Sequence, residues 1–252
     1  MTADSSAPMP ARSREADTPH SLSVRAQARI AGALYLIVIA GGLFAEGVVL
    51  GPLTVAGDAA ATARAIANNE TIWRWGLGVH FIYLGGAALV MYVLLYRLFR
   101  RAQPTFALLA LVFAVVSAAV EGAALLQLYV PLAIMENARG VAALGPGNTE
   151  AVIYLAVRLY EAGFGFALLF FSGFCAATGV IILRSRLAPR PVGVMMVLAG
   201  ACYLVGALST TVAPGIATLL FPWILLPCLV GEASLALWLV VKGADAGQLA
   251  RY

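Results

Sequence analysis

Six apolar stretches of membrane-spanning length alternate with short polar segments along the chain. The hydrocarbon core of a bilayer is about 30 Å thick, so a helix needs about 20 residues to cross it. All six stretches reach that length, and we interpret each as a transmembrane helix. The pattern predicts an all-α, polytopic membrane helix bundle with spans at about 30–52, 75–97, 105–130, 150–183, 191–212 and 217–241.

The polar segments predict how this helical domain, residues 30–243, is bounded. Residues 1–29 are rich in Ala, Ser, Pro and Arg without apolar periodicity, which is typical of a disordered tail. The apolar run that follows is too long for a signal-peptide core, so we expect it to be retained as the first span. Residues 244–252 form a short C-terminal tail.

The basic residues predict the orientation in the membrane. Twelve of the sixteen flank the spans on one side, and the positive-inside rule makes that side cytoplasmic. Both termini are therefore expected inside a cell membrane. These residues are Arg12, Arg14, Arg25, Arg29, Arg97, Arg100, Arg101, Arg184, Arg186, Arg190, Lys242 and Arg251.

The opposite side carries two longer connections. Asp58 to Asn69 combines an N-cap residue with good helix formers, which predicts a short interfacial helix. The second connection, 131–149, contains the turn-forming run 145–148 (Gly-Pro-Gly-Asn), expected to end one helix and cap the next. Four tryptophans fit the aromatic belts of a membrane protein: Trp73, Trp75, Trp223 and Trp238.

Composition agrees with this class of protein. The chain of 252 residues is 62% hydrophobic and 11% charged, which leaves no room for an extended soluble domain. The net charge of +4 reflects membrane orientation, so the bilayer is the expected partner and nucleic acid is not. Cys175, Cys202 and Cys228 lie in apolar runs and are expected to pack as small hydrophobes. Phosphate loops and dinucleotide fingerprints are absent from the sequence, and no cofactor is expected.

Six ionisable residues inside or at the rim of the apolar runs are the candidate functional residues. A charge at the centre of a bilayer helix costs about 2.5 to 3.5 kcal/mol on insertion scales, so such groups usually face partners, water or a ligand. Counting from the cytoplasmic helix ends at 1.5 Å per residue ranks them by depth. Three lie at one level about 5 to 8 Å below the outer boundary, two at the outer rim and one near the midplane. In that order they are Glu46, His80 and Glu121, then Arg158 and Glu161, then Glu232.

The charges of this set do not balance. Four carboxylates face one obligate cation, Arg158, and one histidine, so some glutamates are protonated or a bound cation compensates them. Both arrangements occur in proton- or ion-coupled transporters, but protonated glutamates also serve as interhelical hydrogen-bond donors. Arg158 and Glu161 are spaced i, i+3 and can pair with each other or with neighbouring helices.

Two further patterns leave alternatives open. His80 with Glu46, Glu121 and Glu161 is a nitrogen and oxygen set compatible with a divalent metal. His80 is the one histidine in an apolar run and the sequence has no His-x-x-x-His pair, so no metal site is expected. Pro222 and Pro227 remove backbone donors near the start of the last span, so a kink or a broken helix is expected.

Several short motifs, in order, resemble a known family. They are Arg29-Ile-Ala-Gly-Ala-Leu-Tyr-Leu-Ile, Gly57-Asp58-Ala-Ala-Ala-Thr62, Glu161-Ala-Gly-Phe164 with Phe170-Phe171-Ser-Gly173, Arg190-Pro-Val-Gly193, and Gly231-Glu232 with Leu237-Trp238-Leu-Val-Val-Lys242-Gly243. Over about residues 29 to 243 the chain is similar to the bacterial integral membrane proteins grouped as domain of unknown function 4386. The resemblance implies a six-helix membrane domain and brings no functional residues. The position of Glu161 is often an aspartate in such sequences.

The leading functional hypothesis is a membrane protein without enzymatic activity that binds or transports a small solute, a lipid headgroup or an ion. We expect Glu46, His80, Glu121 and Glu161 to line an outward-facing polar pocket. Arg158 is expected to pair with a carboxylate or capture an anion, and Glu232 to be a deeper protonation site. Two alternatives stay open. One is an intramembrane lipid-modifying enzyme, and the other is a structural or regulatory subunit without a ligand. The sequence sets no oligomeric state.

Overall fold

Helices make up every regular element in residues 23–185 and 187–244, the part of the chain that this computed structural model describes. Five helical segments are long and apolar enough to cross a membrane: Val24–Leu53, Glu70–Phe99, Pro104–Glu136, Gly147–Ser185 and Arg190–Val212. A sixth is a broken pair, Pro214–Leu220 and Leu225–Val241, bent by 56°. The structure therefore confirms an all-helical protein with five or six apolar helices of spanning length.

Most of these segments are composites of several helical pieces. The first joins α1 (Val24–Gly42), the π-helix η1 (Leu43–Leu50) and α2 (Gly51–Leu53). The second joins α4 (Glu70–His80), the π-helix η2 (Phe81–Ala88) and α5 (Leu89–Phe99). The third joins α6 (Pro104–Leu125), the 3-10 helix η3 (Leu126–Tyr129) and α7 (Val130–Glu136). The remaining elements of these segments are α9 (Pro146–Ser185), α10 (Arg190–Val212), the short α11 (Pro214–Leu220) and α12 (Leu225–Val241).

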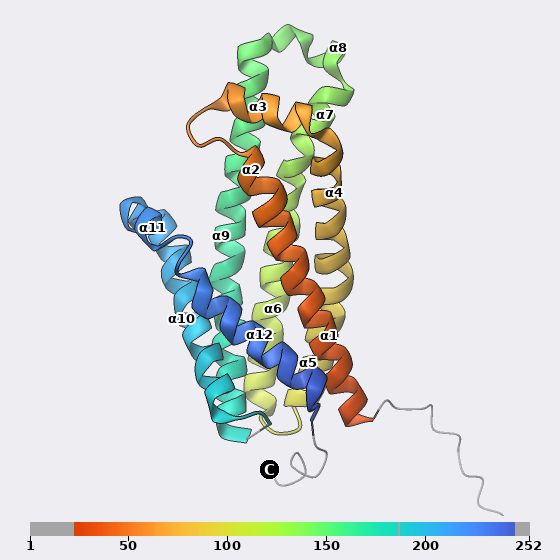
Figure 1. Cartoon of the computed structure of the whole chain (residues 1–252), viewed down its shortest axis with the longest axis vertical. Helices are drawn as coiled ribbons and strands as arrows, with labels where there is room; N and C mark the ends of the chain where they lie inside the picture. Colours follow the sequence, from red (N-terminus) through yellow and green to blue (C-terminus); the bar gives the residue numbers. More distant parts are fainter. Residues whose placement is uncertain (1–22, 186, 245–252) are drawn as a thin grey trace, which may run out of the picture.

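The long helices form an elongated bundle with a small helical cap at one end (Figure 1). Helix α9 packs along both α6 and α10, while α1 packs against α5 and α12. The cap contains α3 (Ala59–Asn68), α7 and the short segments α8 (Ala138–Val141) and η4 (Ala142–Leu144). We call this the cap end, and we call the opposite end, where α1 begins and α12 finishes, the termini end.

The short helix predicted between Asp58 and Asn69 is present as α3. Asp58 is its N-cap, and Asp58 Oδ1 accepts a hydrogen bond of 2.8 Å from the backbone N–H of Ala61. Gly57 just before it has a φ of 78°, a left-handed conformation that favours glycine. The Gly57 N–H donates to the Tyr154 hydroxyl over 2.8 Å, which ties the start of α3 to α9.

Close helix crossings depend on glycine. A Cβ atom on Gly200 of α10 would lie 2.7 Å from the Ser172 carbonyl oxygen and 2.9 Å from the Ala176 nitrogen, both backbone atoms of α9. A Cβ atom on Gly32 of α1 would meet the backbone of α12 at similar distances. Small residues at such crossings let two membrane helices approach closely, which maximises van der Waals contact where no hydrophobic effect drives association.

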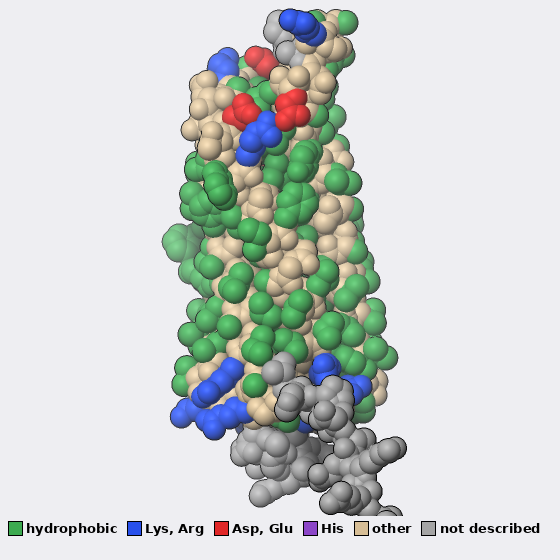
Figure 2. Space-filling view, turned by 90° about the vertical axis from the view of Figure 1, so that its right-hand side faces the viewer, with side chains coloured by type: hydrophobic (Ala, Val, Ile, Leu, Met, Phe, Trp, Pro, Cys, Tyr) green, Lys and Arg blue, Asp and Glu red, His purple; other side chains and the backbone are tan. Residues whose placement is uncertain are grey.

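The surface between the two ends is dominated by apolar side chains (Figure 2). Acidic and basic side chains occur together at the cap end, whereas basic ones gather at the termini end on the face shown. Many large apolar residues are more than a third exposed, including Leu43, Phe81, Leu126 and Phe166. Exposed apolar surface this extensive is unusual for a soluble monomer and fits a protein that contacts lipid.

Two predicted features differ in detail. Helix α1 begins at Val24, so residues 24–29 are helical although we assigned them to a tail. Residues 1–22 and 245–252, which hold the rest of both predicted tails, lie outside the described residues. The segment 131–149 contains helices α7, α8 and η4, because the third span continues past Pro131 through α7.

The last span breaks at one of its two prolines. The break lies between α11 and α12, at residues 221–224 around Pro222, whereas α12 continues through Pro227. Pro227 is the third residue of α12, where backbone N–H groups have no intrahelical acceptor, so its missing donor costs the helix nothing. The predicted kink is thus confirmed, with Pro222 as its position.

Trp73 corrects the prediction of the aromatic belts. Its side chain is only 1% exposed, and its indole N–H donates a 3.0 Å hydrogen bond to the Leu128 carbonyl oxygen in η3. Trp75, two residues further on, is 66% exposed, as expected of a residue at a membrane interface. Side chains two positions apart on a helix point in directions that differ by about 200°, so the two indoles lie on opposite faces.

Candidate functional site

Three of the candidate residues converge at one place in the bundle. Glu46 lies in η1, His80 ends α4 and Glu121 lies in α6, so they come from three different spanning segments. His80 Nε2 is 3.8 Å from Glu46 Oε1, and Glu121 interacts electrostatically with both residues. Two tyrosines complete the group. We call the five residues the Glu46 cluster: Glu46, His80, Tyr83, Glu121 and Tyr160.

A tyrosine hydroxyl connects the histidine to the first carboxylate. The Tyr160 hydroxyl of α9 donates to Glu46 Oε1 over 2.5 Å and lies 3.2 Å from His80 Nε2. On the other side of the imidazole ring, His80 Nδ1 is 2.9 Å from the Gly76 carbonyl oxygen. A carbonyl oxygen only accepts hydrogen bonds, so Nδ1 carries a proton and Nε2 faces the hydroxyl. We call Glu46, Tyr160 and His80 the triad.

The second carboxylate, Glu121, is held by a different tyrosine, which lies on the same segment as His80. The Tyr83 hydroxyl of η2 donates to Glu121 Oε1 over 2.7 Å. Tyr83 follows His80 by three residues, and the centroids of their rings are 5.2 Å apart. The two polar links of the Glu46 cluster therefore lie side by side on one helix face.

Both π-helices of the described chain border this cluster. Glu46 belongs to η1, while η2 begins directly after His80 and contains Tyr83. The wider backbone of a π-helix shifts the direction of the side chains that follow, and such segments are frequent at functional sites. The local backbone thus differs from a regular helix at the positions that bring the cluster together.

One side chain of the Glu46 cluster is partly exposed, and others are buried. The side chain of Glu46 is 37% exposed, whereas that of His80 is 1% exposed, and Tyr160 is fully buried. Tyr160 stacks on Phe164 with ring centroids 6.0 Å apart, which fixes its orientation. Glu46 is therefore the least buried member of the triad.

Arg158 and Glu161 lie at the rim of this cluster. They form an i, i+3 ion pair on α9, with side chains 54% and 36% exposed. Glu161 interacts electrostatically with Glu46, but Arg158 forms no described ion pair with a carboxylate other than Glu161. Of the two pairings considered from the sequence, the structure has the local one.

Glu232 lies apart, in a second polar group that includes Tyr203 and Tyr35. Its carboxylate in α12 accepts a hydrogen bond from the Tyr203 hydroxyl of α10. Tyr35 of α1 interacts with the same carboxyl group. We call Glu232, Tyr203 and Tyr35 the Glu232 cluster.

The tyrosines are the residues that sequence reasoning missed. A tyrosine in an apolar run reads as aromatic filling, because its ring is hydrophobic and its hydroxyl usually finds a partner in the fold. A weak signal was present. Tyr83 follows His80 at the i+3 position, and Tyr160 directly precedes Glu161, so a search for hydroxyls within one turn of each ionisable residue finds both.

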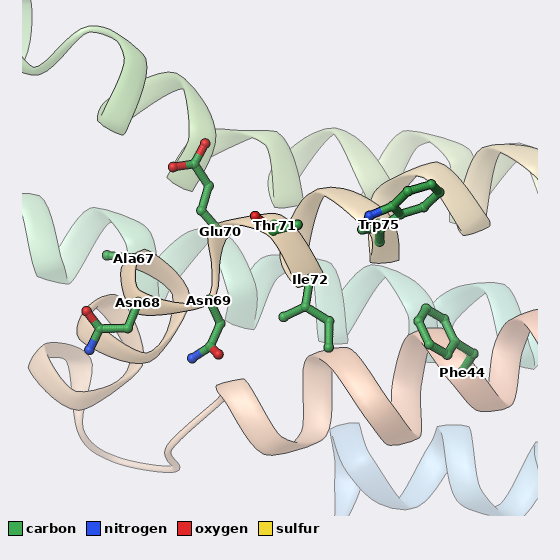
Figure 3. Close-up of a pocket in the computed structure, with 8 residues that line it drawn as sticks. All are labelled: Phe44, Ala67, Asn68, Asn69, Glu70, Thr71, Ile72 and Trp75. Atoms are coloured by element: carbon green, nitrogen blue, oxygen red, sulfur yellow. The ribbon is translucent and has the colours of Figure 1, made fainter.

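The clearest surface hollow lies elsewhere. It has a volume of about 460 Å³, sits at the corner between α3 and α4, and is lined by none of the six candidate residues. Figure 3 shows the rings of Phe44 and Trp75 along one side and the amides of Asn68 and Asn69 along the other. A smaller hollow touches His80 from the side of Trp73 and Leu128 and has no room for a water molecule.

No assembled metal site is found within residues 23–185 and 187–244. No three side chains of His, Cys, Asp or Glu in this part of the chain are placed to hold one metal ion. In the set of His80, Glu46, Glu121 and Glu161, a tyrosine hydroxyl donates to Oε1 of Glu46 and another donates to Oε1 of Glu121.

Comparison with known proteins supplies a family and nothing further. One protein-family model matches residues 30–243, a range that contains both clusters. No curated protein and no solved structure matches the chain. Function is therefore inferred from the side-chain geometry.

Proposed function

The chain belongs to the protein family described as Domain of unknown function (DUF4386). We propose that this membrane protein binds an ion, that the ion is a proton, and that the triad holds it. The observation that carries the proposal is the continuous contact from Glu46 through the Tyr160 hydroxyl to His80 Nε2. Glu121 and Tyr83 flank it as a second acidic group.

Counting hydrogens supports a bound proton. The triad has two short contacts, one on each side of the Tyr160 oxygen, and each needs a hydrogen atom. Tyr160 supplies one. If Glu46 is ionised and His80 is neutral, the other contact brings two acceptors together, which leaves a buried acceptor unsatisfied. One added proton gives both contacts a donor.

That proton fits in two arrangements. In one, His80 is charged, its Nε2–H donates to Tyr160, and Tyr160 donates to the Glu46 carboxylate. In the other, Glu46 is a neutral acid that donates to Tyr160, and Tyr160 donates to neutral His80. Shifting two hydrogens along the same contacts converts one into the other, so the Tyr160 hydroxyl relays a proton between the partly exposed carboxyl group and the buried imidazole.

The dimensions of the site favour an ion over the other ligands expected from the sequence. The hollow beside His80 is too small for a water molecule, and the larger hollow is lined by other residues. A solute or lipid headgroup needs a cavity of some hundreds of Å³ with converging polar groups. A proton needs only the hydrogen bonds that are present.

We propose that the protein crosses the cytoplasmic membrane six times with both termini inside, the broken pair α11 and α12 counting as one span. Basic side chains at the termini end support this orientation, because positive charge accumulates on the cytoplasmic side. Arg184 lies over the Phe106 ring at 4.8 Å, and Arg29 donates to the Val241 carbonyl oxygen at the end of α12. The Glu46 cluster then lies toward the outer face.

Nitrogen NMR of His80 tests the proposal directly. The chain has two histidines, so a H20Q variant leaves His80 as its sole imidazole. In this background we expect Nδ1 to stay protonated at all pH values, while the Nε2 signal changes with pH. Y160F and E46Q, each added to H20Q, should shift the midpoint of that change, because either substitution removes one contact of the triad. E136Q, an exposed cap-end change, is the matched control.

The same spectra separate proton binding from a structural role. If the tyrosine and the carboxylate only hold helices together, Y160F lowers the amount of folded protein while the Nε2 response stays where it was. An Nε2 signal that ignores pH in the H20Q protein would contradict the proposal outright.

A further inference from the structure

Glu232 is a buried carboxyl group that the triad does not use. Its residue is 6% exposed, it lies in α12, and the Tyr203 hydroxyl of α10 donates to Oε1. Among the described residues no ion pair joins Glu232 to an arginine, a lysine or a histidine. A buried carboxylate without a cation is strongly disfavoured, so this group needs a proton or a cation.

Every helix that packs around Glu232 presents an uncharged group to it. Five titratable side chains interact with the carboxyl group, and all five are neutral in their ordinary states. They are Tyr35 from α1, Tyr92 from α5, Cys175 from α9, Tyr203 from α10 and Cys228 from α12 itself. None of them can balance the charge of an ionised Glu232.

The Tyr35 hydroxyl is the second, independent observation. Tyr35 is fully buried, and its hydroxyl lies beside the Glu232 carboxyl group without the regular hydrogen-bond geometry that Tyr203 has. A phenol both donates and accepts. It can accept from a protonated Glu232 and donate to an ionised one, so a small motion of Tyr35 supplies a partner for either state of the carboxyl group.

We propose that Glu232, with Tyr203 and Tyr35, is a second proton-binding site, distinct from the triad and closer to the termini end. Tyr35 and Glu46 lie on the same segment eleven residues apart, about 16 Å along a helix. Tyr203 donates to one carboxyl oxygen, and when the group is neutral its proton can be donated to the Tyr35 hydroxyl as a hydrogen bond. The site does not depend on the triad, since no residue is shared.

Aromatic rings pack beside the second site. Phe174 lies next to the rings of both Tyr35 and Tyr92, at centroid distances of 6.4 and 5.4 Å. Tyr92 in turn interacts electrostatically with Glu121 of one cluster and with Glu232 of the other. The two carboxyl groups therefore have Tyr92 as a common neighbour.

Infrared difference spectra recorded across a pH titration of the purified protein test the second site. A desolvated carboxylic acid gives a C=O stretching band at higher frequency than a hydrated one. We expect one such band to disappear in E232Q and to persist in E46Q. Y35F should shift this Glu232 band, and the exposed control E136Q should leave it in place.

The thiol of Cys175 provides a second measurement that does not require a substitution at Glu232. The Cys175 S–H stretch, assigned by its loss in C175A, should shift at the pH where the Glu232 band titrates, because Cys175 lies in the field of that carboxyl group. A spectrum of E232Q identical to that of the wild type, or a Cys175 band that does not move with pH, overturns the second site. A His80 Nε2 signal that ignores pH, with the Glu232 band intact, overturns the triad and leaves this site standing.

Discussion

At the scale of single residues, neighbouring side chains on α4 contribute very differently. Arg74 bridges Glu70 and Glu136 with two ion pairs of 2.7 Å, but its side chain is 45% exposed. Trp73 makes a single hydrogen bond, to the Leu128 carbonyl oxygen, and is almost completely buried. Burial, more than the number of contacts, decides which of the two residues stabilises the cap end.

Substituting each residue in turn measures this difference. Exposed ion pairs contribute about 0.2 to 1 kcal/mol, so R74Q should change the free energy of unfolding by less than about 1 kcal/mol per pair. W73F leaves a buried carbonyl oxygen without its donor, which costs about 1 to 3 kcal/mol before any cavity is counted. Unfolding curves of both variants in the same detergent check the order, and a greater loss in R74Q than in W73F would contradict it.

At the scale of helices, the crossing of α9 and α10 is set by glycine. Ala replaces Gly in a helix with a gain in propensity of about 1 kcal/mol, while overpacking a tight contact costs about 1 to 3 kcal/mol. At Gly200 the atoms in the way belong to the backbone of α9, which cannot rotate aside as a side chain can. The packing cost therefore exceeds the gain in propensity.

G200A and G78A form a matched pair that tests this balance. Gly78 lies in α4 with nothing within 4 Å of its hypothetical Cβ, so G78A keeps the gain in propensity without the packing cost. We expect G200A to lower the melting temperature and G78A to leave it unchanged or raise it. Equal melting temperatures for the two variants would show that the crossing tolerates a methyl group.

At the scale of the whole molecule, the proposed orientation follows from the two unlike ends of the bundle. The cap end carries acidic and basic groups together, and the basic side chains gather at the termini end. With the termini in the cytoplasm, α3 and its preceding turn at Gly57 lie outside the cell.

Reporter fusions check the orientation. Green fluorescent protein attached after Tyr252 should fluoresce, because it folds in the cytoplasm, whereas alkaline phosphatase at the same position should be inactive. Alkaline phosphatase inserted after Gly57, in an exposed turn, should be active. The reversed pattern of the two phosphatase fusions would place the termini outside and the Glu46 cluster toward the cytoplasm.

The sequence predicted the architecture well because long apolar runs depend on local composition alone. Span positions, the helix capped by Asp58 and the broken last span all follow from residue types and spacing. Depth counting also placed Glu46, His80 and Glu121 at one level, and the structure brings these three together. Their role in proton binding stays a proposal.

The partners of those residues were not predictable in the same way. Tyr160 reaches Glu46 across 114 positions of sequence, and nothing local to either residue encodes that contact. The burial of Trp73 likewise depends on where η3 passes, so a rule based on tryptophan position alone misplaced it. Pairings across helices are properties of the packed bundle.

Helix α9 has a mechanical consequence. Its 40 residues span about 60 Å at 1.5 Å per residue, roughly twice the 30 Å of hydrocarbon that a membrane presents. Helix α9 is therefore a rod longer than one bilayer crossing, with the cap at one end (Figure 1). For a chain of only 26.3 kDa, this rod gives an antibody fragment bound to the cap a fixed orientation relative to the buried helices, which makes the cap a natural landmark for particle alignment in electron microscopy.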